Sequence, residues 1–127
     1  MVQAVVTDGN DLLILITKAT MKEKNIQTLV IDDEPNSLNL HATLLDKYCP
    51  QVEVVGMADS IEKAQQHLQK DTPDLLLLDI EMGNSCSLEW LQQLNRSDFE
   101  VIFISAYDHY ALKAFKFHAL DFLLKPI

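Results

Sequence analysis

Five short apolar runs, each separated from the next by a longer segment with helical spacing, constrain the fold of this chain more than any other feature. The runs cover residues 26–31, 52–56, 74–79, 101–105 and 120–124. Their near-continuous apolar character is typical of strands that are buried on both faces of a parallel sheet. Strands that alternate with helices predict a doubly wound α/β fold with right-handed crossovers.

Four amphipathic segments between these runs predict helices. They cover residues 35–48, 59–68, 88–94 and 108–118. Pro35 suits the first position of the first helix, because a helix leaves that N–H without a partner in any case. Asp59 and Glu62 have the spacing of a capping box, and Asp108 can cap the last helix.

The composition describes one acidic domain. A chain of 127 residues with 48% apolar and 23% charged residues is typical of a single soluble globular domain. The formal net charge of −9 argues against nucleic-acid binding by this chain. Cys49 and Cys86 lack metal-ligand spacing and predict reduced cytosolic thiols. The early apolar run 12–16 is too short for export or membrane insertion, so we expect a cytoplasmic protein without a membrane partner.

Both ends of the chain depart from the alternating pattern. Residues 1–24 predict an N-terminal extension ahead of a domain over residues 25–127, and residues 12–16 can form an added edge strand. A helix normally follows the last strand of such a unit, but the chain stops at Ile127, so we expect the last helix to be missing. The apolar sheet face that it would cover then needs residues 1–20, a second chain or a further C-terminal segment.

Polar residues stand where four of the apolar runs end. They are Asp32 with Asp33, then Asp79, Ser105 and Lys125. The carboxyl ends of parallel strands meet at one edge of a sheet, and sites in open α/β sheets lie at that edge. Three carboxylates, a hydroxyl and a lysine in one place suit a divalent cation and a phosphoryl group.

The local motifs at these positions resemble those of a known family. They are Asp32-Asp33, Leu78-Asp79-Ile80-Glu81-Met82, Ser105-Ala106 and Leu124-Lys125-Pro126. Together they resemble the signature of two-component response regulator receiver domains, over residues 26–127. Residues 103–115 and 121–126 resemble receivers of the LytR/AlgR type, which precede a LytTR-type DNA-binding domain. The resemblance implies a flavodoxin-like, five-stranded parallel sheet with the order 2-1-3-4-5.

The resemblance also assigns roles at the acidic edge. It makes Asp79 the phosphoacceptor, which agrees with the ability of a carboxylate to form a covalent phosphoryl intermediate. Asp32 and Asp33 suit Mg²⁺, which prefers oxygen ligands. In the family these acids hold Mg²⁺ with the phosphoacceptor and with the backbone carbonyl of the residue two positions later, here Glu81.

Three further residues receive roles in switching. Ser105 would donate a hydrogen bond to one phosphoryl oxygen, and Lys125 would place its charge beside another. Phe122 stands three residues before the lysine, at the position where a receiver aromatic ring moves when the hydroxyl is drawn inward. A plain core aromatic is an equally good interpretation of Phe122. The readout surface would be the fourth helix and fifth strand, about residues 108–124.

The resemblance implies a signalling switch that accepts phosphate from a sensor histidine kinase and acts as an enzyme only on its own phosphorylation state. Homodimerisation is open, and DNA would be contacted only through an effector domain outside this chain. The alternative is a pseudo-receiver that acts as an interaction or dimerisation module without phosphorylation. A haloacid-dehalogenase-like phosphotransferase is disfavoured, because Asp32-Asp33-Glu34 lacks the DxD spacing after the first strand.

The chain departs from typical receivers in the loop after Asp79. Gly83 stands where Pro is frequent, and Ser87 stands where Gly is usual, so we expect this loop to take a different path. The four histidines, His41, His67, His109 and His118, show no metal-ligand spacing and are interpreted as surface or rim residues.

Overall fold

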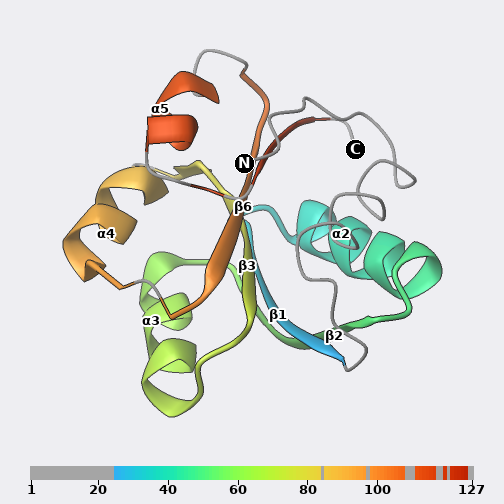
Figure 1. Cartoon of the computed structure of the whole chain (residues 1–127). Helices are drawn as coiled ribbons and strands as arrows, with labels where there is room; N and C mark the ends of the chain where they lie inside the picture. Colours follow the sequence, from blue (N-terminus) through green and yellow to red (C-terminus); the bar gives the residue numbers. More distant parts are fainter. Residues whose placement is uncertain are drawn as a thin grey trace.

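The computed structural model describes residues 25–83, 85–96, 98–107, 111–116, 119 and 121–125, and their main element is a five-stranded parallel sheet (Figure 1). The strands are β1 (Ile26–Ile31), β2 (Val52–Ala58), β3 (Leu75–Asp79), β6 (Glu100–Ser105) and β7 (Asp121–Leu124). Their order is β2-β1-β3-β6-β7, and every neighbouring pair is parallel. Strands β4 and β5 form a separate pair outside this sheet. When the five strands of the sheet are numbered along the chain, their order is 2-1-3-4-5, so the predicted fold class is confirmed.

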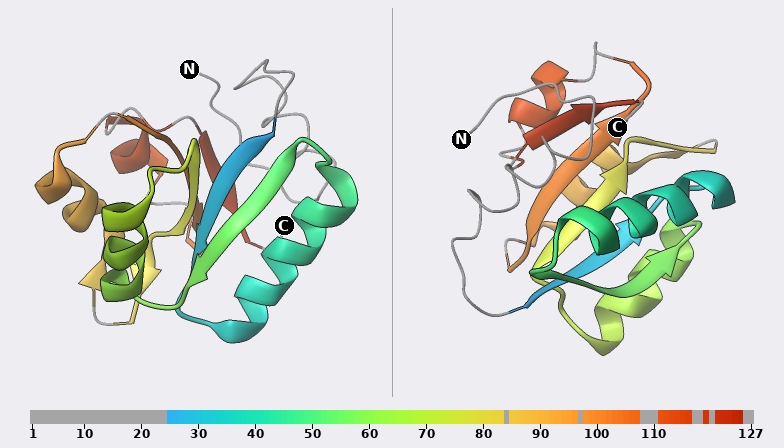
Figure 2. Two further views of the ribbon diagram at one scale, coloured as in Figure 1. Left: turned by 90° about the horizontal axis from the view of Figure 1, so that it is seen from below. Right: turned by 90° about the vertical axis from the view of Figure 1, so that its right-hand side faces the viewer.

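Helices cover both faces of the sheet. They are α2 (Pro35–Tyr48), α3 (Ile61–Lys70), α4 (Ser87–Leu94) and α5 (Ala111–Lys116). Helix α2 lies on one face, and α3, α4 and α5 lie on the other, as two perpendicular views agree (Figure 2). The buried apolar side chains accordingly form two clusters, one on each face of the sheet.

Strand β3 lies at the centre of the sheet and is buried along its whole length. Its four leucines alternate between the two clusters, with Leu76 and Leu78 on one face and Leu75 and Leu77 on the other. Burial of each leucine side chain contributes roughly 1.5–3 kcal/mol relative to exposure. The continuous apolar run therefore forms a central strand because both of its faces are covered.

The face that carries α2 also contains the buried side chains of Ile102, Ile104 and Leu123 from β6 and β7. Residues 1–24 and 126–127 lie outside the described residues, so the expectations for both ends of the chain remain predictions.

Local chemistry explains how the helices begin. Helix α2 starts at Pro35, as predicted. Helix α3 starts one residue beyond Ser60, whose hydroxyl oxygen accepts the Lys63 N–H at 3.2 Å. The prediction that Asp59 caps this helix is therefore wrong by one residue, and Asp59 instead pairs with the Lys63 ammonium at 3.0 Å on the exposed surface. Asp108, the predicted cap of the last helix, lies outside the described residues.

A short hairpin follows β3. Strands β4 (Glu81–Met82) and β5 (Ser85–Cys86) pair in antiparallel fashion and lead directly into α4. Gly83, between the two strands, has a φ angle of 62°, which residues with a Cβ adopt only at a cost. The loop that carries the two departures from the family pattern is therefore a hairpin in this chain.

None of the helices in the described ranges combines the length and the apolar character that a membrane span requires.

Candidate functional site: an acidic edge with one lysine

The ends of four parallel strands place the predicted residues at one edge of the sheet. Asp32 directly follows β1, Asp79 ends β3, Ser105 ends β6 and Lys125 directly follows β7. The register brings the last residues close, because Asp79 lies opposite Ile104, and Ser105 lies opposite Leu124. The Lys125 N–H also donates to the Ser105 carbonyl at 2.8 Å, which fixes the backbone from which the lysine side chain extends.

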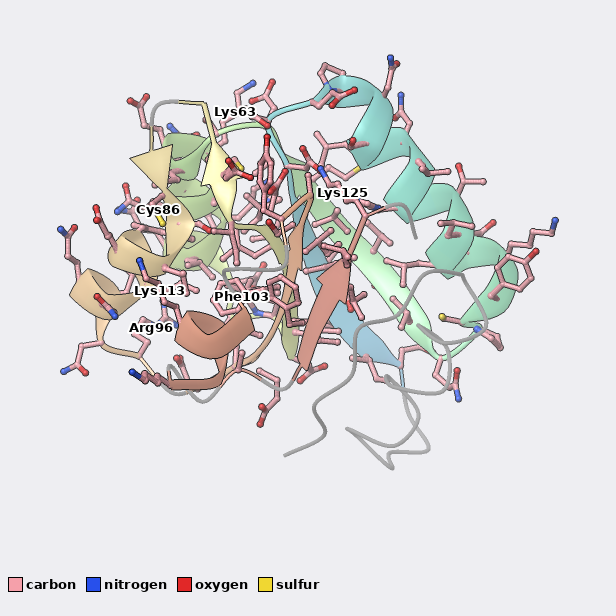
Figure 3. All side chains as sticks on the ribbon, turned by 90° about the horizontal axis from the view of Figure 1, so that it is seen from above. Lys63, Cys86, Arg96, Phe103, Lys113 and Lys125 are labelled. Carbon is pink, nitrogen blue, oxygen red and sulfur yellow. The ribbon has the colours of Figure 1, made fainter. Side chains whose placement is uncertain are left out.

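The Lys125 ammonium bridges two buried carboxylates. Its Nζ lies 3.0 Å from Oδ2 of Asp79 and 3.2 Å from Oδ2 of Asp32. Lys125 lies where β7 ends, and its side chain reaches across the edge toward β1 and β3 (Figure 3). Buried charges are stable only when they are paired and hydrogen-bonded, and this one cation serves both acids.

Backbone N–H groups hold the remaining carboxylate oxygens in place. The Glu34 N–H donates to Oδ1 of Asp32, and the Glu81 N–H donates to Oδ1 of Asp79, each at 3.0 Å. Asp33 is exposed, and its Oδ2 accepts the Gly83 N–H at 2.7 Å. The hairpin after β3 is therefore tied to the loop after β1 through a carboxylate of the site.

The surroundings shift the pKa values of the two buried acids, Asp32 and Asp79, in opposite directions. Burial alone would raise the pKa of the Asp32 carboxyl, but the His41 contact, the Glu34 N–H and the Lys125 ammonium together lower it to about 2. Burial raises the pKa of Asp79 to about 6, and the Asp32 charge adds to this rise while Lys125 opposes it. The two acids also raise the pKa of Lys125 against the effect of burial. Asp32 is thus firmly ionised, and Asp79 is the acid that takes up a proton first.

The three carboxylates suit a small divalent cation. Asp32, Asp33 and Asp79 each offer an oxygen, and these oxygens lie within 4.8 Å of one another. Mg²⁺ binds through one or two carboxylates and retains several waters, so one exposed acid beside two buried ones fits this ion. A hollow of about 280 Å³, lined in part by Asp33, Met82 and Gly83, opens beside the exposed acid. The donor set therefore fits the predicted metal.

Glu81 is two residues beyond Asp79, where the resemblance places a metal-binding carbonyl. The described contact of Glu81 with the site is made by its N–H, which orients the Asp79 carboxylate. Coordination by its carbonyl remains a prediction.

The predicted switch residues are both buried. The Ser105 hydroxyl oxygen accepts the Tyr107 N–H at 3.0 Å, which orients this side chain in the loop that follows β6. Phe122 lies in the apolar cluster on the face of α3, α4 and α5, opposite Phe103 in the neighbouring strand. Both positions are compatible with the proposed roles, which remain predictions.

Ser87 shows how this chain accommodates a side chain where receivers usually have Gly. The hydroxyl of Ser87 is buried, and its single O–H lies within donor distance of two carbonyl oxygens, those of Asp79 at 2.7 Å and Ile80 at 3.1 Å. The Ser87 N–H donates to the same Ile80 carbonyl at 2.9 Å. The first residue of α4 therefore holds the backbone of the predicted phosphoacceptor.

His41 is a residue of the site that the sequence interpretation placed wrongly. It was predicted to be a surface or rim residue, but it is only 2% exposed, and its Nε2 lies 3.3 Å from Oδ2 of Asp32. A helical signal was available, because His41 follows Leu38 by three residues and precedes Leu45 by four, and both leucines are buried. His67 is half-buried, as expected of a rim residue, and His109 and His118 lie outside the described residues.

A doubly wound sheet with three acids and a lysine at its carboxyl edge is the arrangement that the motifs predict for a receiver domain. A family model described as the response regulator receiver domain matches residues 28–127 of this chain. The chain therefore belongs to the response regulator receiver domain family, as its motifs predicted.

Individual relatives agree with this assignment. The sensory transduction protein LytT of Bacillus anthracis is 37% identical over 103 residues, which are 80% of this chain and 42% of that protein. The transcriptional regulatory protein BtsR of Escherichia coli K12 is 38% identical over 80% of this chain and 43% of its own length. The chain thus spans less than half the length of these curated relatives.

Solved structures show the same fold. The response regulatory domain of mrkE from Klebsiella pneumoniae has a TM-score of 0.72 and 25% identity, over 80% of this chain and 84% of that one. The response regulator TrrA from Thermotoga maritima, solved in complex with Mg²⁺ and BeF, has a TM-score of 0.66 and 28% identity, over 80% and 88% of the two chains. These similarities support the family assignment, but they do not assign roles to single residues.

Proposed function

We propose that Asp79 accepts a phosphoryl group from a sensor histidine kinase and that this modification switches the domain between two states. The observation that carries the proposal is the bridge of the Lys125 ammonium between Asp79 and Asp32, with Asp33 beside them. The Asp79 carboxylate then lies at the sheet edge beside the Lys125 ammonium and beside two further acids that would bind a metal ion with it. This is the charge arrangement that phosphoryl transfer requires.

The reaction is an in-line displacement at phosphorus. A carboxylate oxygen of Asp79 forms the new O–P bond while the P–N bond of the kinase phosphohistidine breaks, and the imidazole leaves with the bonding electrons. Burial raises the pKa of Asp79 only to about 6, so the carboxyl is ionised and nucleophilic at pH values well above that. Lys125 is held at the same carboxylate and can follow the phosphoryl oxygens with its charge.

Asp32, Asp33 and Asp79 would hold Mg²⁺, with the Glu81 carbonyl as a further ligand. When bound, this ion would neutralise negative charge on the phosphoryl oxygens. The similarity to TrrA, solved with Mg²⁺ and BeF, supports this assignment. The domain would then act as an enzyme only on its own phosphorylation and dephosphorylation.

Ser105 and Phe122 would transmit the change. The Ser105 hydroxyl would turn toward a phosphoryl oxygen, and the Phe122 ring would occupy the space that the hydroxyl leaves. The changed surface would comprise α5 and β7, within residues 108–124. The similarity to LytT and BtsR supports an output in transcription, through an effector domain beyond the part of those relatives that this chain matches.

Phosphorylation can be tested directly with a small donor. The protein is incubated with Mg²⁺ and acetyl phosphate, and its intact mass is measured. We expect one added phosphoryl group in the wild type and in Asp46→Asn, a variant of an exposed acid on α2, and no added group in Asp79→Asn. Wild type that stays unlabelled while folded would contradict the proposal and favour the phosphorylation-independent interaction module. Equal labelling of Asp79→Asn would assign the phosphate to another residue.

A further inference from the structure

His41 is a buried polar side chain on a helix face that is otherwise apolar. It lies between Leu38 and Leu45 on the buried face of α2. Burial of a polar group without a hydrogen bond is unfavourable, so a leucine would serve packing at this position better. Both ring nitrogens of His41 lack a well-aligned hydrogen-bond partner among the described residues. The imidazole therefore has donor capacity that packing does not use.

The ring faces one carboxylate of the acidic edge. Nε2 of His41 lies 3.3 Å from Oδ2 of Asp32, and the two side chains are 3% and 0% exposed. This distance is long for a hydrogen bond, and a small rotation of the ring would tighten it. The contact comes from α2, whereas Lys125 reaches the same oxygen from β7 at 3.2 Å. Two groups from different elements therefore share one oxygen of Asp32.

Phosphorylation would change one of these contacts and leave the other. Lys125 must turn toward the new phosphoryl oxygens, and its contact with Asp32 weakens as it does so. His41 is anchored in a helix and enclosed by the core, so its contact with Asp32 can persist. Carboxylates that bind metal are held in position by such outer hydrogen bonds.

We propose that His41 is a positioning residue that holds the Asp32 carboxylate in its metal-binding orientation, both before and after Lys125 moves to the phosphoryl group. The inference rests on the proposed function, because it assigns a role toward the same Mg²⁺ site. It adds a histidine of α2 to the residues that determine how tightly this domain binds the ion.

The test compares Mg²⁺ affinity in four proteins by isothermal titration calorimetry. His41→Gln keeps an amide N–H₂ close to the position of Nε2, His41→Asn withdraws that donor, and His41→Leu replaces the ring by an apolar side chain. Loss of an outer hydrogen bond of this kind typically costs 10–100-fold in metal affinity. We expect a loss of about 10-fold or more in His41→Asn and His41→Leu, and recovery of most of the wild-type affinity in His41→Gln.

A control separates positioning from packing. Leu45→Val removes a buried methylene from the same face of α2 and should lower the melting temperature in EDTA without changing the Mg²⁺ dissociation constant. Labelling by acetyl phosphate provides a second measure, because saturating Mg²⁺ should restore the rate in His41→Asn if only affinity is reduced. If His41→Leu fails to fold, the comparison of His41→Gln with His41→Asn is sufficient for the test.

The outcomes distinguish this inference from the proposed function. Equal Mg²⁺ affinity in wild type, His41→Gln and His41→Asn would overturn the role of His41 and leave the metal site intact. An affinity loss in Leu45→Val equal to that in His41→Asn would assign the effect to packing and overturn the inference as well. Wild-type protein that binds no Mg²⁺ would overturn both the metal site and the role of His41.

Discussion

One lysine balances the charge of two buried acids at the sheet edge, and the two acids respond to it differently. The Asp32 carboxylate contacts the Lys125 ammonium and His41, and it accepts the Glu34 N–H. The Asp79 carboxylate contacts the same ammonium and accepts the Glu81 N–H. The pKa of Asp32 falls to about 2, and that of Asp79 rises to about 6. The metal-free site therefore carries an unfavourable charge on Asp79 at neutral pH, and a bound cation would relieve it.

This unfavourable charge predicts that Asp79→Asn stabilises the metal-free protein at neutral pH. Folding raises the pKa of Asp79 from 3.8 to about 6, so the folded protein binds this proton more tightly than the unfolded chain does. Ionisation therefore costs stability, fully above about pH 6, and the cost fades as the pH falls toward 3.8. We expect a gain of roughly 1–3 kcal/mol above pH 6 that disappears near pH 4, measured by urea unfolding in EDTA.

The matched control is Asp46→Asn, which removes the same charge from an exposed position on α2. Its free energy of unfolding relative to wild type should change little over the same pH range. An Asp79→Asn variant that is less stable than wild type at pH 7 would show that the Lys125 bridge outweighs the cost of burial.

The residues of the site were predictable from the sequence to different degrees. The sequence identifies Asp32, Asp79 and Lys125 as site residues, because each stands where an apolar run ends and parallel strands bring such ends together. His41 was not recognised, because a histidine within a helical segment is ordinarily solvated, and its partner Asp32 lies nine residues earlier, in the loop after β1. Only the folded chain shows that the buried face of α2 carries a polar side chain toward the acidic edge.

At the scale of elements, the five strands were predictable and the hairpin after β3 was not. Each strand is a largely apolar run of four to seven residues flanked by polar residues. The predicted bounds of the five strands differ from the observed ones by no more than two residues. Strands β4 and β5 have two residues each, which is too short for any periodic pattern. The hairpin depends instead on the φ angle of Gly83 and on its N–H bond to Asp33.

The backbone at Gly83 predicts a distinctive pair of substitution effects. Gly83 has a φ angle of 62°, and the nearest atom to a Cβ built there is Oδ2 of Asp33, at the ordinary contact distance of 3.9 Å. Gly83→Ala should therefore destabilise the protein by about 1–2 kcal/mol through backbone strain alone. Gly83→Asn should cost less, because asparagine visits the left-handed region more readily.

Urea unfolding of the two variants in EDTA measures this difference. Equal losses in Gly83→Ala and Gly83→Asn would show that side-chain bulk, and not the φ angle, limits this position. Because Asp33 is tied to Gly83, we also expect Gly83→Ala to weaken Mg²⁺ binding, which the same calorimetric titration would detect.

The whole molecule carries a formal net charge of −9, so any cation relieves some of its self-repulsion. A specific metal site must therefore be distinguished from general screening. Specific binding stabilises the folded state by mass action and depends on three acids at one edge, whereas screening depends only on the total charge and on ionic strength. Variants that lose one charge at different places separate the two effects.

We expect Mg²⁺ at a hundredfold excess over its dissociation constant to stabilise the wild type by about 2.7 kcal/mol, seen as a rise in melting temperature at constant ionic strength. Asp32→Asn should lose most of this rise, because it removes a buried ligand of the cluster. Asp46→Asn has the same net charge and should retain the whole rise. Equal responses of Asp32→Asn and Asp46→Asn would mean that Mg²⁺ acts only by screening, and the three carboxylates at the sheet edge would then not form a metal site.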